Sequence, residues 1–190
     1  LFAIIAGIAL SELLVGSAEN RNPGGSSAGA PSVGGPFTLV NHHGKTVTEQ
    51  DFRGRFMLLY FGFTFCPDIC PTELGVMAAA VNALGEKGEQ VTPALITIDP
   101  ERDTPEVLGR YITNVTDKVT GITGEPEDVA RMARSFGIYV RKVDLDGGDY
   151  TIDHTASILM IDSTGDFAGT IAYGENPDNA MAKLRRLAGS

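Results

Sequence analysis

The sequence has no tryptophan, only two cysteines and only three histidines among its 190 residues. Two cysteines cannot form the multi-disulfide framework that stabilises small secreted domains. No basic cluster is present, and a net charge of −9 with an isoelectric point near 4.7 argues against nucleic acid and anionic membrane surfaces as partners. With 43% hydrophobic residues, the chain can bury one core. Composition therefore favours one globular domain whose partners are proteins or metal ions.

The N-terminal part differs in composition from the rest. Residues 1–15 are apolar except for Ser11 and Glu12, and the first residue is not Met. A membrane-spanning helix needs roughly 17–25 apolar residues, so we interpret residues 1–18 as a truncated transmembrane anchor, with a cleaved signal segment as the alternative. Residues 19–36 are rich in Gly, Ser and Pro and predict a flexible linker. The folded domain is expected at residues 37–190.

Within that domain the hydrophobic pattern predicts alternating strands and helices. The expected strands are residues 37–40 and 46–48 as a hairpin, then 56–61, 92–98, 119–122, 157–162 and 167–173. The expected helices follow Cys70, begin at Pro105 and Pro126, and close the chain from Pro177. This order predicts an α/β domain with a thioredoxin-like fold and an N-terminal β-hairpin extension.

Both cysteines, Cys66 and Cys70, lie where the strand at residues 56–61 gives way to a helix. The positive end of a helix dipole and its free N–H groups lower cysteine pKa values, so we expect reactive thiols. A four-residue separation is expected to place both sulfurs on one face of the first turn. There they can form a disulfide or bind one soft metal ion, which two thiolates alone would leave under-coordinated.

Three motifs together resemble the Sco (SenC) family of membrane-tethered copper proteins. They are Tyr-Phe-Gly-Phe-Thr-Phe-Cys-Pro-Asp-Ile-Cys-Pro-Thr at residues 60–72, Asp-Pro-Glu-Arg-Asp-Thr-Pro at residues 99–105, and Asp-His at residues 153–154. The two cysteines alone would be a weak signal. The three motifs stand in the family's order and span the folded region, which makes the resemblance specific.

The resemblance implies that Cys66, Cys70 and His154 bind a single copper ion. It also implies delivery of copper, or of reducing equivalents, to the dinuclear copper site of cytochrome c oxidase. The oxidase subunit with that site is the expected partner, together with another periplasmic copper chaperone or a thiol reductase. The family's plan implies an N-terminal anchor in the bacterial inner membrane with the domain facing the periplasm, or the mitochondrial intermembrane space in a eukaryote.

His154 is also the best third ligand when the histidines are compared directly. His42 and His43 fall in the turn of the expected hairpin, where a solvated tip is the simpler interpretation. His154 stands just before the strand at residues 157–162, in a segment without the cis-proline that thioredoxin-like redox proteins normally carry there. Two thiolates suit Cu(I), and an imidazole admits Cu(II), whereas zinc prefers four ligands. A satisfied surface histidine is the alternative.

Four aspartates near these motifs have two interpretations each. Asp153 is a candidate to orient the His154 imidazole, or a turn residue. Asp99 and Asp103 are candidates to shape the loop beside the metal, but helix capping around Thr104 is the favoured role. Asp68 either tunes the site or is a solvated loop carboxylate.

Two functions compete for this set of residues. A copper metallochaperone needs all three proposed ligands, whereas a thiol–disulfide reductase that uses Cys66 and Cys70 as a redox pair does not need His154. Both are compatible in one protein, because Cu(I) binding requires the reduced pair. A thiol peroxidase ranks lower. An inert structural disulfide would leave His154 and the phenylalanines at positions 61, 63 and 65 without a role, unless these rings are simply core.

Overall fold

The computed structural model describes residues 33–189. The expected anchor at residues 1–18 and the expected linker up to residue 32 lie outside this range. Residues 33–36, the end of the expected linker, lie on the domain: the Gly34 N–H donates to the Ser135 carbonyl at 2.8 Å, and Val33 packs against the core. Within residues 33–189, no helix is both long enough and apolar enough to cross a membrane.

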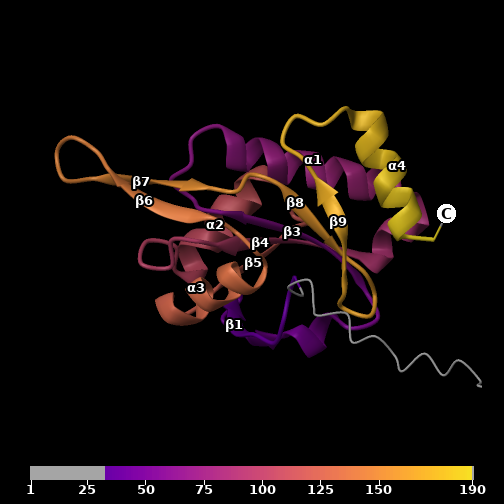
Figure 1. Ribbon diagram of the computed structural model, residues 1–190, viewed down its shortest axis with the longest axis horizontal. Coiled ribbons are helices and arrows are strands. Elements are labelled where there is room, and N and C mark those ends of the chain that lie inside the picture. Colours follow the sequence, from indigo (N-terminus) through magenta and orange to yellow (C-terminus); the bar gives the residue numbers. More distant parts are fainter. Residues whose placement is uncertain (1–32, 190) are drawn as a thin grey trace, which may run out of the picture. The chain divides into compact units, whose positions relative to one another are not determined.

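The described chain contains nine strands, four α-helices and two short 3₁₀ helices (Figure 1). The strands are β1 (Thr38–Asn41), β2 (Thr46–Thr48), β3 (Phe56–Gly62), β4 (Val91–Thr97), β5 (Thr120–Thr123), β6 (Val140–Asp144), β7 (Tyr150–His154), β8 (Ile158–Ile161) and β9 (Phe167–Ile171). The helices are η1 (Glu49–Phe52), α1 (Ile69–Ala83), η2 (Gly85–Gln90), α2 (Pro105–Val115), α3 (Pro126–Ser135) and α4 (Pro177–Leu187).

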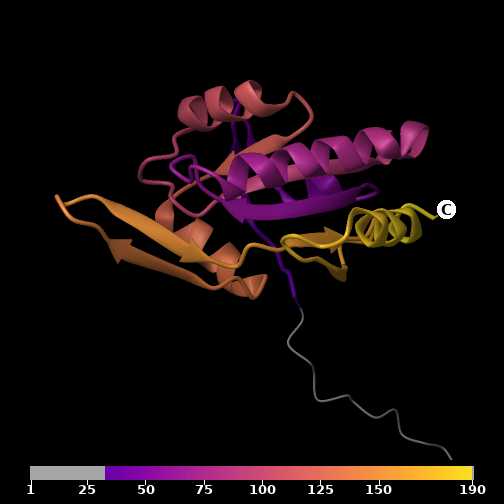
Figure 2. The same cartoon turned by 90° about the horizontal axis from the view of Figure 1, so that it is seen from above.

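Seven strands form the main sheet in the order β2-β1-β5-β4-β3-β8-β9. Strands β3, β4 and β5 are parallel, and α1 and α2 connect them in turn. Right-handed crossovers that step in the same direction place their helices on the same face of the sheet. Figure 2 shows α1 and α2 together on one side and α3 on the other. The predicted α/β class, the N-terminal hairpin and the order of these elements are confirmed.

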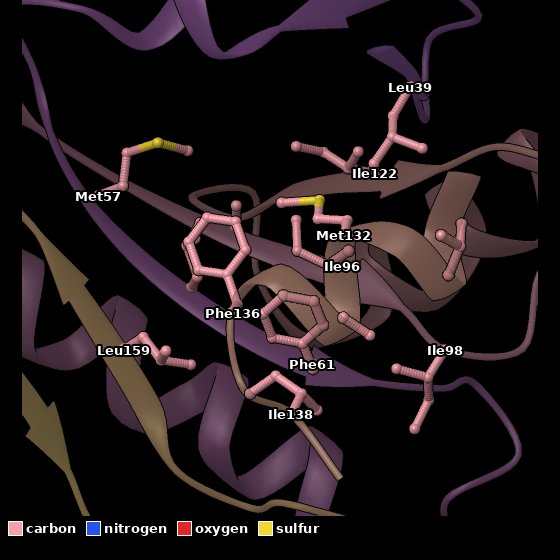
Figure 3. Close-up of a cluster of buried hydrophobic side chains, with 14 of the residues drawn as sticks. Leu39, Met57, Phe61, Ile96, Ile98, Ile122, Met132, Phe136, Ile138 and Leu159 are labelled. Atoms are coloured by element: carbon pink, nitrogen blue, oxygen red, sulfur yellow. The ribbon is translucent and has the colours of Figure 1, made fainter. Parts of the chain in front are cut away.

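The central strands β3, β4 and β8 of the main sheet are buried on both faces, which explains the continuous apolar run of β3. Successive side chains of a strand point to opposite faces. Leu58 and Tyr60 accordingly pack with α1, α2 and α4, whereas Leu59 and Phe61 pack with α3. Figure 3 shows the buried cluster that contains Leu59 and Phe61, in which the Phe61 and Phe136 ring centroids lie 5.8 Å apart. A substitution on β3 therefore disturbs one of two separate cores.

Strands β6 and β7 form a separate two-stranded hairpin that projects from the domain (Figure 1). The sequence did not predict this hairpin, because only Ile152 among its ten strand residues is buried, so no apolar alternation marks it. His154 precedes β8 as expected, but it lies in a strand that the sequence did not predict. His154 is the last residue of β7 and pairs with Val140 on β6.

Candidate metal centre

The topology brings the three sequence motifs to one edge of the main sheet. Strands β3 and β4 are parallel and in register, with Gly62 opposite Thr97, so the loops that follow them leave from the same edge. Strand β8 runs antiparallel to β3 and enters the sheet at this edge, which places the segment after His154 beside the cysteine loop. Ligand sites of open α/β sheets lie at the carboxyl ends of the parallel strands.

The two cysteines occupy different environments. Helix α1 begins at Ile69, so Cys70 lies in its first turn and Cys66 lies in the loop before it. The expectation that both sulfurs lie within the first turn is therefore correct only for Cys70. The Cys70 N–H donates to the Cys66 sulfur at 3.4 Å, which satisfies one of the free amides at the helix N-terminus. Cys70 is fully buried, Cys66 is partly exposed, and both are free thiols.

Hydrogen bonding shifts the pKa values of the two cysteines in opposite directions. The pKa of Cys66 is lowered to about 4, first by its hydrogen bond with the Cys70 thiol, and also by bonds from His154 and from the backbone of Cys70 and Asp68, which together outweigh burial. The same Cys66 bond raises the pKa of Cys70, and burial raises it further. In the reduced pair, Cys66 is therefore the thiolate and Cys70 its proton donor.

Tyr60 and Gly62 on β3 shape the space around the Cys70 sulfur. The Tyr60 hydroxyl donates to the Cys70 sulfur across 3.8 Å. A Cβ atom at Gly62 would lie 3.0 Å from that sulfur and 2.9 Å from the Tyr60 ring, so only glycine fits without a shift. Neither residue had a predicted role in the site, although both lie in the 60–72 motif.

His154 stands at the end of β7 with its ring between aromatic neighbours. The ring lies edge-on to Tyr60 and Phe63, with centroid distances of 6.1 and 5.9 Å. Its Nδ1 lies 2.9 Å from the Thr155 carbonyl oxygen, which can only accept, so Nδ1 carries the proton. Nε2 is then the nitrogen that faces Cys66, and it can bind a metal ion once it has lost its proton.

Cys66 and Cys70 are in contact, and His154 is a hydrogen-bonding neighbour of Cys66. Within residues 33–189, however, no three His, Cys, Asp or Glu side chains converge closely enough to form a ready-made metal cluster. The three proposed ligands are thus adjacent but not yet gathered around one point. A metal ion bound by all three would draw His154 and the cysteine pair closer together.

The other two histidines lie away from the cysteines. The expectation that His42 is a solvated tip is wrong, because its Nδ1 accepts a hydrogen bond from the Gly121 N–H at 2.9 Å. Burial, followed by repulsion from His43, lowers the pKa of His42. His42 therefore joins the hairpin to β5 as a neutral imidazole, whereas His43 is exposed.

The favoured role of Asp99 and Asp103, capping of α2, is wrong, whereas Asp103 has the other role considered for it, shaping the cysteine loop. Asp103 is fully buried and does not cap α2; the Thr104 side chain does so, accepting from the Val107 N–H. The Asp103 carboxylate instead accepts from the Thr64 N–H, the Thr64 hydroxyl and the Thr97 hydroxyl at 3.0, 2.5 and 2.6 Å. Asp103 therefore fixes the start of the cysteine loop.

Asp153 is exposed and forms an ion pair with Arg141 across the hairpin, so the partner of the His154 ring is the Thr155 carbonyl instead. Asp99 is buried and also does not cap α2: its carboxylate accepts from Arg102 and from the Tyr150 hydroxyl. Asp68 is exposed at the N-cap position of α1, where its side chain makes no capping bond.

The fold and the cysteine site together define a thioredoxin-like protein with a reactive cysteine pair and an adjacent histidine. The family model described as SCO1/SenC matches residues 25–189. The chain belongs to this family.

Named relatives agree with the assignment. The chain is 41% identical over 155 residues to the mitochondrial protein SCO1 homolog 1 of Arabidopsis thaliana, covering 81% of this chain and 46% of the relative. It is 40% identical over 169 residues to protein sco1 of Schizosaccharomyces pombe, covering 87% and 63%. The chain thus spans about half to just under two thirds of the length of these two relatives.

Solved structures of the family superpose closely. Bradyrhizobium japonicum ScoI with copper bound gives a TM-score of 0.76 at 37% identity, covering 82% of this chain and 99% of that one. Yeast Sco1 with copper bound gives 0.76 at 32% identity, covering 84% and 90%. BsSco, described as a member of the Sco family of cytochrome c oxidase assembly proteins, gives 0.66 at 25% identity, covering 83% and 93%.

Proposed function

We propose that this chain is a copper metallochaperone that binds one copper ion through Cys66, Cys70 and His154 and delivers it to the dinuclear copper site of cytochrome c oxidase. The observation that carries the proposal is the pairing of a Cys66 thiolate with a neighbouring imidazole whose Nε2 is free of the Thr155 bond. The copper-bound Sco relatives and the assembly role stated for BsSco support it.

The donor set fits copper chemically. Two sulfurs are the soft ligands that Cu(I) prefers, and one imidazole nitrogen adds a ligand suited to Cu(II). The site lies at the surface, because Cys66 is partly exposed while Cys70 is buried. An acceptor can therefore approach from the Cys66 side. The cargo can then move by ligand exchange, in which acceptor sulfurs replace the sulfurs of this chain one at a time.

The names and sources of the relatives support a proposed cellular location for the domain. Several relatives carry the word mitochondrial in their names, and another is from the bacterium Rickettsia prowazekii. We place the domain on the periplasmic side of a bacterial inner membrane, or in the mitochondrial intermembrane space, held by an anchor at residues 1–18 and a linker at residues 19–32, since residues 33–36 lie on the domain. A second periplasmic copper chaperone or a thiol reductase would supply copper or electrons.

A thiol–disulfide reductase is the second candidate, favoured by the low pKa of Cys66 beside a thiol at Cys70. The Cys66 thiolate attacks one sulfur of a partner disulfide, and the other partner sulfur leaves as a thiolate. Cys70 then loses its proton and attacks the Cys66 sulfur, which releases the second partner thiol. The chain is oxidised to a disulfide by two electrons, and the partner is reduced to two thiols.

One acceptor distinguishes the two functions: the purified soluble domain of the oxidase subunit that contains the dinuclear copper site. The copper-loaded chain is mixed with the reduced, copper-free acceptor, and copper transfer is measured after separation. The reduced, copper-free chain is mixed with the acceptor in its disulfide form, and new acceptor thiols are counted. Metallochaperone activity predicts copper transfer that His154→Ala abolishes. Reductase activity alone predicts new thiols, unaffected by His154→Ala, and no copper transfer.

His43→Ala is the matched control, because it removes an exposed histidine outside the site. This variant should transfer copper as the wild type does. Equal copper transfer by His154→Ala and His43→Ala would contradict the three-ligand proposal. If Cys66→Ser loses both activities and His154→Ala loses neither, only the cysteine pair is required for function.

A further inference from the structure

Arg102, in the loop between β4 and α2, links the cysteine loop to the β6–β7 hairpin. Its guanidinium carbon lies 4.4 Å from the Phe65 ring centroid and 3.7 Å from the Tyr150 ring centroid. Phe65 immediately precedes Cys66, and its side chain is 58% exposed. Tyr150 is the first residue of β7, the strand that ends at His154. One side chain therefore touches both segments that carry the proposed ligands.

Polar contacts fix Arg102 in this place. Its Nε donates to the Asp99 carboxylate at 2.5 Å, and one terminal nitrogen donates to the Tyr150 carbonyl and to Asp149, both at 3.2 Å. The Tyr150 hydroxyl donates to the other oxygen of Asp99 at 2.8 Å. Asp99 is only 3% exposed, so this carboxylate anchors both Arg102 and Tyr150 to the main domain. We call Asp99, Arg102, Phe65 and Tyr150 the Arg102 cluster.

The hairpin has few other attachments to the domain. Strands β6 and β7 pair with each other and not with the main sheet, and Ile152 is their one buried residue. At the base, Tyr139 and Thr155 exchange hydrogen bonds with each other. An isolated two-stranded hairpin is marginally stable at best, so its position depends on side contacts such as the Arg102 cluster.

We propose that Arg102 is a positioning residue that sets how closely the hairpin, and with it His154, approaches the cysteine pair. The inference rests on the proposed function, because it concerns the approach of the third copper ligand. The three ligands are adjacent but not converged, so the fraction of molecules with His154 in reach determines the apparent copper affinity. The Arg102 cluster raises that fraction by restricting the hairpin to positions near Cys66.

Variants that also lack the His154 imidazole distinguish a positioning role of Arg102 from a merely structural one. If Arg102 and Tyr150 act by placing His154, their substitution weakens copper binding in the wild type and has no further effect once His154 is alanine. If they only support the fold or the cysteine loop, the loss is the same in both backgrounds. A double-mutant cycle measures this difference directly.

The experiment compares copper affinity, by competition with a chelator under anaerobic conditions, for Arg102→Met and Tyr150→Leu, each alone and combined with His154→Ala. We expect about a tenfold loss for each single variant, the order of a desolvated cation–π contact, and less than about twofold in the His154→Ala background. Tyr150→Leu keeps the proposal testable if Arg102→Met fails to fold with Asp99 left unpaired. Equal losses in both backgrounds, or no loss in either, would overturn the inference.

Arg141→Met is the matched control, because Arg141 lies on β6 and pairs with exposed Asp153 without touching the cysteine loop. It should leave copper affinity unchanged. A second measurement needs no copper: amide hydrogen exchange in β7 of the metal-free chain should be faster in Arg102→Met than in Arg141→Met. Failure of the wild type to bind copper would refute the proposed function, whereas equal exchange in the two variants would refute the positioning role of Arg102.

Discussion

Asp103 fixes Thr64 at two points, accepting hydrogen bonds from both its backbone N–H and its hydroxyl. Thr64 stands two residues before Cys66, so a residue 39 positions away determines where the cysteine loop leaves β3. The Thr97 hydroxyl donates to the same carboxylate from the end of β4. Asp103 thereby joins the two loops that meet at the sheet edge.

Removal of this carboxylate should be costly for the fold. Asp103→Ala leaves the Thr64 N–H and the Thr97 hydroxyl without an acceptor, and hydrogen bonds to charged groups contribute about 1.5–3 kcal/mol each. We expect the free energy of unfolding, measured with urea, to fall by about 3 kcal/mol. Thr104→Ala is the control: it removes the adjacent cap of α2 and should cost about 1 kcal/mol. A smaller loss for Asp103→Ala than for Thr104→Ala would contradict the assignment.

The two thiols should differ in reactivity in the reduced, metal-free chain. Cys66 is partly exposed with a lowered pKa, because the Cys70 thiol and backbone N–H groups stabilise its thiolate. Cys70 is buried with a raised pKa. Iodoacetamide should therefore modify Cys66 first, at a rate that changes little between pH 6 and 8, since only the thiolate reacts. Mass spectrometry of the peptides measures this order, and first labelling at Cys70 would refute it.

A substitution at Gly62 tests how tightly β3 packs against the Cys70 sulfur. In Gly62→Ala the new methyl group would meet the Cys70 sulfur at 3.0 Å and Leu95 at 3.2 Å. Overpacking of this kind costs about 1–3 kcal/mol, so the variant should unfold at lower urea concentration and bind copper more weakly. Gly75→Ala, in α1 with no heavy atom within 4 Å of the new Cβ, is the control. It should gain up to about 1 kcal/mol from helix propensity, and a loss equal to that of Gly62→Ala would argue against the packing explanation.

His42 should make stability depend on pH. Burial lowers its pKa in the folded chain, so between neutral pH and the folded pKa the unfolded chain binds a proton that the folded chain does not. The free energy of unfolding therefore falls as pH decreases below the ordinary histidine value near 6.5. His42→Asn retains an acceptor for the Gly121 N–H without this titration. Urea unfolding at pH 7.5 and 5.5 should show a smaller decrease for His42→Asn, and equal decreases would exclude this origin.

The order of elements was predictable because most strands and helices carry local signals. Pro105 and Pro126 each occupy the first turn of a helix, and β3 is an unbroken apolar run between two cores. The hairpin of β6 and β7 carries no such signal, because its side chains are mostly exposed on both faces. Its existence depends on contacts such as that of Tyr150 with Arg102, which residue spacing does not reveal.

The sequence identified the residues of the candidate site, but it did not predict their geometry. Cys66 and Cys70 follow from one motif, and the family resemblance drew attention to His154. Shaping of the loop was one of two roles considered for Asp99 and Asp103, but the capping signal of Thr104 favoured the other role, and residue spacing does not reveal their partners elsewhere in the chain. Asp103 binds Thr64 from the cysteine loop, and Asp99 binds Tyr150, 51 residues further on.

An anaerobic copper titration of the reduced chain, with the ligands identified by X-ray absorption spectroscopy, tests the three-ligand copper site directly. We expect one copper ion per chain with two sulfur ligands and one imidazole nitrogen. His154→Ala should remove the nitrogen and weaken binding, whereas His43→Ala should change neither. Binding by two sulfurs alone, with the same affinity in the wild type and in His154→Ala, would contradict the three-ligand site.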